Sequence, residues 1–448
     1  MDDVVANLGA PDLVTYGTEA FVCPEYARAE PEKLWRKTWQ HACRVEEIPN
    51  IGDYVVYDIA EDTIVIVRSD ADEISAFHNV CAHRGRRLVD GCGHARRFHC
   101  KYHAWQYDLR GENIRVLDKE DWGGGLKPER LNLPKVKVDT WGGWVWINMA
   151  ADCQPLADYL SPMTELLGPF EFDKMRYRWR YRGVFECNWK VAIEAFMEAY
   201  HVEGTHPQLT KYAEFYTWST TDGLHSHKGF RERKSKLQTP ESNSYFRPGK
   251  GDDVRRSIAE MQAEIYRTTN ASTTQTLVDA AARLIDELPE AATAGEVTAH
   301  WLNSAKADDA ARGVTWPEIS PEQIAKAGNS CHLFPNLAIG FGFTFALCYR
   351  ARPFGTDPDK CIFEGYVIER FPEGEEPKTE WVQANSDEAG KWPPVLVQDI
   401  ENMPEVQRGM KSSGFRGALP NPLQEQPISN FHHNLARYMG TGGLKPLE

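Results

Sequence analysis

Two cysteine–histidine pairs lie close together in the sequence and constrain the fold more than any other feature. One residue separates Cys81 from His83, sixteen separate His83 from Cys100, and two separate Cys100 from His103. Thiolate and imidazole both bind soft and borderline metals well. Two such pairs in one short segment therefore predict a metal site formed by two loops that the fold brings together.

Four ligands of this kind suit two metal groups. Zinc takes two cysteines and two histidines as one tetrahedral site, whereas a [2Fe–2S] cluster takes both cysteines on one iron and both histidines on the other. Zinc fingers more often pair like with like and place the histidines on a helix, but here both loops lie between predicted strands. Tyr102, Trp105 and Tyr107 also favour a cluster, which must be shielded from water. The intervening loop holds three further candidates that we expect to be spectators, since four ligands are already supplied: Cys92, His94 and His99.

The segment around these pairs alternates apolar and polar residues, as β-strands do. The runs that predict strands are 53–59, 63–69, 74–80 and 142–149. Before them, residues 24–42 place aromatic and apolar residues at helical spacing. We therefore predict an N-terminal helical segment at 1–37 and a small all-β domain at 38–155.

A second pattern begins after residue 155. Residues 188–201 are rich in Ala, Glu and Met without internal Gly or Pro, which predicts a helix, and further helical patterns lie within 252–313. Strands are predicted at 177–187, within 332–355 and at 360–371, and a helix mixed with loops from residue 404 onward. Residues 156–448 are thus predicted to be an α+β domain, an antiparallel sheet with helices packed on it.

The predicted helix at 188–201 carries a second group of candidate ligands. Glu194, Glu198 and His201 are spaced four and three apart, so they would share one helix face. His206 would lie about 140° away on a continuous helix, but a glycine and a proline beside it predict that the helix ends and lets His206 turn back. Two histidines and one carboxylate with open positions form the ligand set of non-haem Fe(II) oxygenases.

Composition excludes several classes of protein. The net charge of −14 argues against nucleic acid as a partner. The sequence has no run of about 18 apolar residues, so we expect no membrane span. The first residues lack the pattern of a signal peptide. The ten cysteines form no disulfide framework, so we expect reduced thiols and a cytoplasmic location. Seven basic residues against two acidic ones between 81 and 110 predict either docking of an acidic protein or salt bridges, intersubunit or internal.

The stretch 81–111, including Gly85 and Gly111 after the two pairs, resembles the Rieske motif. Together with the segment NWK…E…YH…H, it resembles the Rieske non-haem iron oxygenases, the terminal oxygenase (α) subunits of ring-hydroxylating systems. The resemblance covers most of the chain and implies a catalytic domain of the helix-grip type. It also implies the ligands, which are Cys81, His83, Cys100 and His103 for the [2Fe–2S] cluster and His201, His206 and Asp399 for a mononuclear Fe(II), with Glu401 as the alternative to Asp399.

The resemblance further implies an activity and partners. Electrons from a reductase or a ferredoxin would pass through the cluster to the mononuclear iron, which would use O2 to mono- or dihydroxylate an aromatic or alicyclic ring, as in aromatic hydrocarbon catabolism. Members of the family form head-to-tail trimers, with or without a β subunit, so Glu198 would bridge His103 of one subunit and His201 of the next. Two departures are that Ala195 stands where many members have Asn, and Glu198 where dihydroxylating members commonly have Asp.

The sequence constrains the substrate less than it constrains the metal ligands. A hydrophobic small molecule would bind in a pocket lined by aromatic and apolar residues, for which the candidates are Phe196, Met197, Phe334, Phe341 and Phe343, although such residues are more often core. The region 207–330 is expected to be a lid over the substrate channel or a structural insert. The segment around Asp399 also resembles members that oxidise quaternary ammonium compounds, so the alternative is a monooxygenase or demethylase with an aromatic cage. A pure electron-transfer or iron-storage protein would need no second histidine pair.

Overall fold

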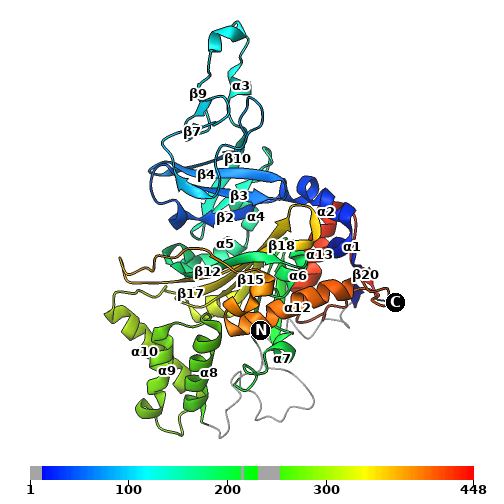
Figure 1. The fold of residues 1–448 in the computed structure, drawn as a ribbon. Helices are drawn as coiled ribbons and strands as arrows, with labels where there is room; N and C mark the ends of the chain where they lie inside the picture. The colour runs from blue at the N-terminus through cyan, green and yellow to red at the C-terminus, as the bar shows by residue number, and fades with distance from the viewer. Residues whose placement is uncertain (1–12, 213–215, 231–252, 448) are drawn as a thin grey trace. The chain divides into compact units, whose positions relative to one another are not determined.

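The computed structural model describes residues 13–212, 216–230 and 253–447, which divide into two units (Figure 1). The smaller unit comprises 28–161 with 354–356, and the larger comprises 1–27, 162–353 and 357–448. The predicted segment 1–37 and the predicted insert 207–330 therefore lie partly outside the described residues. Within the described residues, no helix is both long and apolar enough to cross a membrane.

The smaller unit is built on an antiparallel sheet with the strand order β2-β11-β10-β5-β4-β3-β6. Its strands are β2 (Gln40–Arg44), β3 (Asp53–Ile59), β4 (Asp62–Asp70), β5 (Glu73–His78), β6 (Cys92–His94), β10 (Lys135–Trp141) and β11 (Trp144–Asn148). The four predicted strands are confirmed, although β5 ends two residues early, because the buried Asn79 side chain bonds the backbone of Leu88 and Val89 instead. The predicted helix over 24–42 is helical only as far as Trp35, since Gln40 already belongs to β2.

A second, smaller sheet in this unit carries one of the cysteine–histidine loops. It consists of β7 (Phe98–His99), β8 (Gln106–Tyr107) and β9 (Asn113–Arg115). Phe77, Phe98 and Trp105 pack with both cysteines into one apolar core. Gly85 closes the first loop with a φ of +73°, a conformation that side chains other than glycine's rarely adopt.

The larger unit contains a sheet with the strand order β13-β14-β15-β16-β17-β18-β12-β19, antiparallel except that β12 and β19 run parallel. Its strands are β12 (Arg176–Phe185), β13 (Thr217–Asp222), β14 (His225–Phe230), β15 (Ser330–Leu333), β16 (Leu337–Phe341), β17 (Phe345–Phe354), β18 (Asp357–Glu369) and β19 (Val382–Gln383). The predicted run 332–355 is thus three strands. It breaks at Pro335, which cannot donate to a ladder, and at the turn around Gly342, whose N–H donates to the Phe345 carbonyl.

Helices of the larger unit fall into two groups (Figure 1). The first is α6 (Trp189–Glu194), α7 (Val202–Thr205), α12 (Pro394–Met410) and α13 (Gln426–Met439). In this group α6 contacts β18 and α12, and α13 contacts β13 and β14. The second group is α8 (Val254–Thr269), α9 (Gln275–Glu287) and α10 (Ala294–Ala311), which pack side by side around Ile258, Leu284 and Trp301. The prediction of an α+β fold, with an all-β domain preceding a sheet-and-helix domain, is confirmed.

The predicted continuous helix at 188–201 is wrong. Helix α6 begins where the Asn188 side chain accepts from the Lys190 N–H, and it ends at Glu194. The next turns are tighter, because the Phe196 and Met197 N–H groups donate three residues back. The ammonium of Lys228, on β14, donates to the Phe196 carbonyl at 3.3 Å, so a contact from the sheet replaces one that a longer helix would make.

Candidate metal centres and the adjoining cavity

The two cysteine–histidine loops form the first candidate metal centre. Each loop is a tight backbone turn, because the N–H groups of Cys81 and Cys100 donate to carbonyls five residues ahead, both at 2.9 Å. Both cysteines are buried free thiols. The rings of His83 and His103 lie 4.5 Å apart between centroids and are only partly buried. The four predicted ligands are therefore brought together at one end of the apolar core.

The groups around these ligands fit a [2Fe–2S] cluster. Burial raises the pKa of the Cys81 thiol, and the neighbouring Cys100 thiol raises it further, although the Tyr107 hydroxyl, 3.3 Å from the Cys81 sulfur, opposes this. Such a pair of crowded, buried thiols is stabilised when a metal replaces both protons. The Nδ1 atom of His83 is buried without a hydrogen-bond partner, and buried nitrogens of this kind need a partner. Trp105 stacks on the same imidazole, with 4.9 Å between centroids.

The basic residues of this unit divide into paired and unpaired ones. Arg110 pairs with Asp70 and Glu73, and Arg87 pairs with Asp58 and Asp90. Among the basic residues between 81 and 110, those that are exposed and form no ion pair within the described residues are Arg84, Arg86, Arg96, Arg97 and Lys101. Internal salt bridges thus account for only part of the local positive charge. The unpaired cations remain available to an acidic partner.

The three spectator candidates lie on β6 and β7. Cys92 is exposed. The Nδ1 atom of His94 lies 3.0 Å from Asp53 on the neighbouring β3, and His99 is exposed. These contacts and exposures agree with a structural role for the two strands and leave the four predicted ligands as the group around the buried thiols.

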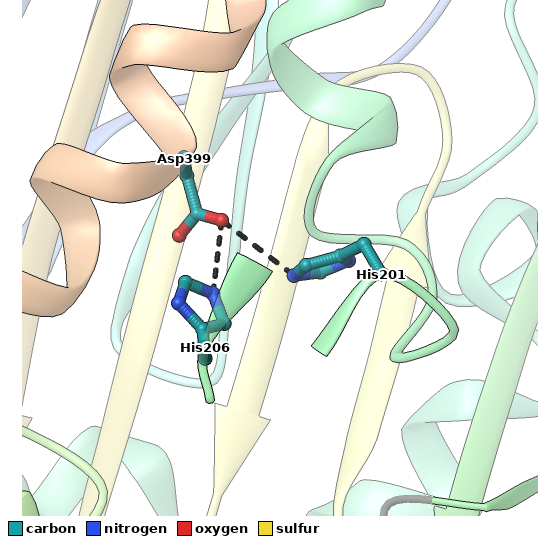
Figure 2. A group of neighbouring side chains, drawn as sticks. All are labelled: His201, His206 and Asp399. Atoms are coloured by element: carbon teal, nitrogen blue, oxygen red, sulfur yellow. Dashed lines mark ion pairs between the residues drawn. The ribbon is translucent and has the colours of Figure 1, made fainter. Parts of the chain in front are cut away.

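The second candidate centre lies in the larger unit and joins His201, His206 and Asp399 (Figure 2). One Asp399 oxygen lies 3.0 Å from His206 Nε2 and 3.6 Å from His201 Nε2. The ligand atoms of all three residues lie within 4.8 Å of one another. The two histidines flank the single turn of α7, and Asp399 comes from α12. Glu401, the alternative carboxylate, is exposed on the same helix.

Hydrogen bonds on the far side of each imidazole orient this centre. His201 Nδ1 lies 2.6 Å from Glu198 Oε1, and His206 Nδ1 lies 2.8 Å from Gln398 Oε1, which also accepts from the Gln208 amide. Both partners accept hydrogen bonds, so each Nδ1 can donate outward and leave Nε2, beside the Asp399 carboxylate, to offer its lone pair to a cation. Two lone pairs and a carboxylate converging on one point fit a cation and match the ligand set of non-haem iron.

Burial and pairing with opposite charges shift the pKa values of Glu198 and His201 in opposite directions. Burial acts to raise the pKa of Glu198, but the hydrogen bond to His201, its charge and that of Lys228 lower it overall. For His201, burial lowers the pKa, and the hydrogen bond and charge of Glu198 together with Asp399 more than offset it. Burial lowers the pKa of the Lys228 ammonium to about 8.

A cavity of about 350 Å³ opens beside this centre. Four carboxylates line it, from Glu194, Glu198, Asp399 and Glu425, together with Tyr16 and His201. Exposed Val406 and Leu419 also line it, so it reaches the surface. Tyr16 and Glu425 escaped the sequence analysis, because they lie near the two ends of the chain and belong to no motif or spacing that links them to the histidines.

The five residues predicted to line a substrate pocket are not among those that line this cavity. Half-buried Phe196 stacks on Tyr349 with 3.6 Å between ring centroids, and Met197 is buried. The other three pack in separate places, with Phe334 on Phe431 and Tyr438, Phe341 on Phe170 and Phe172, and Phe343 on Trp316. Substrate contact by these residues stays a prediction.

Two centres of this chemistry on one chain define a class, that of proteins with an iron–sulfur centre and a separate histidine–carboxylate iron centre. Sequence comparison agrees. Residues 38–121 match the Rieske [2Fe-2S] domain, and residues 172–441 match the ring hydroxylating alpha subunit catalytic domain. The second match covers more than half of the chain, so the chain belongs to the ring-hydroxylating α-subunit family of Rieske non-haem iron oxygenases. The predicted family and its two cofactors are thereby confirmed.

Individual relatives differ in what they act on. The chain is 32% identical over 187 residues to the glycine betaine monooxygenase oxygenase subunit of Chromohalobacter salexigens, covering 42% of each. It is also 32% identical over 187 residues to the biphenyl 2,3-dioxygenase α subunit of Rhodococcus jostii, covering 40% of each. These matches span less than half the length of either relative.

Solved structures show the same division. The fold is similar to a quaternary ammonium Rieske monooxygenase in complex with L-carnitine, with a TM-score of 0.64 and 19% identity over 96% of this chain and 97% of that one. It is similar to naphthalene 1,2-dioxygenase bound to phenanthrene, with a TM-score of 0.63 and 17% identity over 96% and 93%. These structures have a common fold with this chain and do not separate the two substrate classes.

Replacing Cys81 by serine tests the first centre. We expect the purified protein to be red-brown, with the iron and sulfide of one [2Fe–2S] cluster plus one further iron per chain. Cys81→Ser should bleach the colour and remove the sulfide while the histidine–carboxylate centre still binds iron, because the two centres use separate ligands. Metal and sulfide analysis checks this, with Cys92→Ser as the control. Zinc without sulfide in the wild type would contradict the assignment.

Replacing Asp399 by alanine tests the second centre. We expect Asp399→Ala to lose mononuclear iron while the visible spectrum of the cluster persists, because two neutral imidazoles alone hold Fe(II) weakly. The matched control is Glu401→Ala, which removes an exposed carboxylate from the same helix and should keep its iron. Iron titration into the apoprotein measures both, and the reverse pattern would make Glu401 the ligand.

Proposed function

We propose that this chain is a terminal oxygenase component, which takes electrons from a redox partner and uses O2 to hydroxylate a small organic substrate. The observation that carries this proposal is the presence on one chain of a Cys2His2 group with two buried thiols and a second centre in which two imidazoles and a carboxylate converge. Bound iron would supply single electrons at the first centre and O2 activation at the second. An electron carrier alone would have no use for the second.

Glu198 is proposed to link the two kinds of centre between subunits. Its Oε1 atom lies 2.6 Å from His201 Nδ1. Glu198 also lines the cavity, which reaches the surface. On the other unit, exposed Tyr102 lies beside His103 and beneath the guanidinium of Arg84, 4.7 Å from the ring centroid. An acidic cavity and a basic, aromatic tip are complementary, which supports a head-to-tail trimer in which Glu198 also contacts His103 of another copy.

The substrate is proposed to lie on the opposite, aromatic side of the second centre. Phe196, Tyr349 and Phe363 stack with their planes within 20° of one another. Burial raises the pKa of the Tyr349 hydroxyl, and the Asp399 charge raises it further, so this wall adjoins the centre. An apolar, flat wall favours an aromatic or alicyclic ring that stacks on it after half-buried Phe196 swings aside.

A quaternary ammonium substrate is the second candidate. The same rings, with Trp392 beside Phe363 at 5.6 Å, could surround a methylated cation. The negative potential from Asp399 and Glu198 would favour such a cation. Relatives named for glycine betaine and carnitine monooxygenation support this alternative, and relatives named for biphenyl dioxygenation support the first.

The electron donor is proposed to be an acidic reductase or ferredoxin. Five exposed cations without an ion pair, Arg84, Arg86, Arg96, Arg97 and Lys101, lie within the segment 81–103 that carries the cluster ligands, and charge complementarity of this kind raises association rates. High salt should therefore slow electron delivery more than it slows substrate binding.

A substrate screen tests the proposed chemistry. The loaded protein, reduced chemically, should consume O2 in proportion to product when given aromatic or alicyclic ring compounds, and mass spectrometry should show one or two added hydroxyl groups. Quaternary ammonium compounds form the second panel, where formaldehyde release marks a demethylation. O2 uptake that no substrate of either panel stimulates would contradict the function.

Replacing Glu198 by glutamine tests the bridge. The amide keeps the size of the side chain but loses the charge that holds the His201 Nδ1 hydrogen. We expect full iron content and a reducible cluster, with reoxidation of the reduced cluster by substrate and O2 slowed about 10–100-fold, the usual effect of losing an outer partner of a ligand. Stopped-flow absorbance measures the rate, and exposed Glu203→Gln is the control. Wild-type reoxidation in Glu198→Gln would place the electron path elsewhere.

A further inference from the structure

One buried ammonium near the second centre has only part of its hydrogen bonding satisfied. Lys228, on β14, is 6% exposed. An ammonium has three hydrogens to donate, and within the described residues Lys228 donates only to the Phe196 carbonyl, at 3.3 Å. A buried charge is costly unless acceptors or an opposite charge face it. The other two hydrogens therefore call for an acceptor that the described part of the chain does not supply.

The carboxylate whose charge acts most on Lys228 is that of Glu198, and it is already bonded elsewhere. Its Oε1 atom lies 2.6 Å from His201 Nδ1, and its Oε2 atom accepts from the His201 N–H at 3.0 Å. Both oxygens thus serve the histidine, and in the described ranges Glu198 forms its ion pair with His201 and none with Lys228. Lys228 feels the charge of Glu198 without a direct contact.

The register of the sheet places Lys228 on the same face as the aromatic wall. Lys228 pairs with Ser330 on β15, Ser330 with Gly340 on β16, and Gly340 with Leu347 on β17. Paired residues share a face of the sheet, and so do residues two apart on one strand. Because Tyr349 follows Leu347 by two residues, Lys228 lies on the face from which Tyr349 stacks on the other rings.

The residues between Lys228 and the rings are small. Ser330 and Gly340 are half-buried, and a methyl group added to Gly340 would meet no heavy atom closer than 4.0 Å beyond its chain neighbours. Neighbouring strands lie about 4.8 Å apart, so the strip from β14 to β17 is about 14 Å wide. A small molecule that stacks on Tyr349 can therefore extend along this strip toward Lys228.

The other charges of the site give such a molecule one orientation. Asp399 and Glu198 are negative and repel an anionic group, whereas the ammonium of Lys228 attracts it. A molecule with an apolar end and an acidic end would therefore place the acid on the sheet beside Lys228 and leave the rest of the molecule toward the rings and the centre. Holding a substrate in one orientation is itself a large part of catalysis.

We propose that Lys228 binds a carboxylate of the substrate, so that the substrate is a small organic acid whose other end lies against the stacked rings. The inference rests on the proposed oxygenase function and narrows its substrate class. Two hydrogens of the ammonium donate to the carboxylate, and the third stays on the Phe196 carbonyl. Hydrogen bonds between charged groups are stronger than neutral ones, so the acid completes the bonding of Lys228 and Lys228 selects the acid.

The charge of Lys228 sets the pH range of this binding. Burial lowers its pKa to about 8, so the affinity for an acid should fall as pH rises through about 8, where the amine becomes neutral. The other titratable groups coupled to Lys228 by charge are Glu198, His201, Cys331 and His332. Burial raises the pKa of Cys331 far above this range and lowers that of His332 to about 3, so neither changes charge there.

The decisive variant is Lys228→Met, which keeps the length of the side chain but removes its charge. Titration calorimetry of the holoprotein measures binding of two pairs of probes that differ by one carboxylate, benzoate with benzamide and glycine betaine with choline. At least one acid should bind the wild type more tightly than its partner. We expect Lys228→Met to weaken that acid about 10–100-fold and to leave the partner unchanged.

Two further variants separate charge from structure. Lys228→Arg keeps a charge that does not titrate, so it should retain the preference for the acid and lose the decline near pH 8. Lys306→Met removes an exposed ammonium on α10 that pairs with Glu318, and it should behave as the wild type does. A decline near pH 8 that persists in Lys228→Met would overturn the proposal.

Turnover gives a second readout. The charge of Lys228 also acts on Glu198, but a change in electron delivery affects both members of a probe pair alike. The ratio of kcat/KM for the acid to that for its partner should therefore fall in Lys228→Met, mainly through KM. A wild type that binds neither acid better than its partner would overturn the proposal without any variant.

The outcomes also separate this inference from the oxygenase function. If compounds of either panel stimulate O2 uptake and Lys228→Met leaves every acid-to-partner ratio unchanged, the carboxylate site is wrong and the oxygenase function stands. If acids bind through Lys228 but no compound stimulates O2 uptake, the oxygenase function fails. The claim that the acid is a substrate then falls with it, while the carboxylate site remains as a property of the fold.

Discussion

The contact of one Asp399 carboxylate with the Nε2 atoms of two histidines is the interaction on which the rest of the larger unit depends. His201 and His206 are only five residues apart, so a straight helix would point them in different directions. The chain meets this constraint by ending α6 early and leaving a single helical turn between the histidines. Helix α12 must then pack against α6, because its carboxylate completes the centre. Glu198 and Gln398 hold the outer nitrogens and so fix the direction of both lone pairs.

The spacing of motifs predicts the candidate ligands but not the local structure that positions them. Cys81, Cys100 and their histidines, like the pair His201 and His206, stand at spacings that suit metal binding, so sequence alone selects them as candidate ligands. The continuous helix at 188–201 was predicted from propensity, which could not register the Lys228 ammonium on a distant strand or the Glu198 side chain that accepts from the His201 N–H. Local preference is a weak guide where tertiary contacts compete with it.

The walls of the cavity show a different limit of sequence reasoning. Glu425 and His432 look like ordinary polar residues at the start of and within an amphipathic helix, α13, and Tyr16 directly follows the short strand β1 (Val14–Thr15). Nothing in their spacing relates them to Glu194, from which they are separated by more than 170 residues. Only tertiary contacts make them neighbours, because Tyr16 and His432 both bond the Glu194 side chain at the end of α6.

Two chemically different groups of side chains lie near the second centre. Carboxylates line the cavity beside it, and Phe196, Tyr349 and Phe363 form a stack in which the Asp399 charge raises the pKa of Tyr349. Lys228 lies between them, since it donates to the backbone of Phe196 while its charge acts on Glu198. A fully buried ammonium is costly unless an opposite charge faces it. If the organic substrate binds beside the rings, Lys228 links the position of Phe196 to the charge of Glu198. A change at either residue would then reach the other through this one side chain.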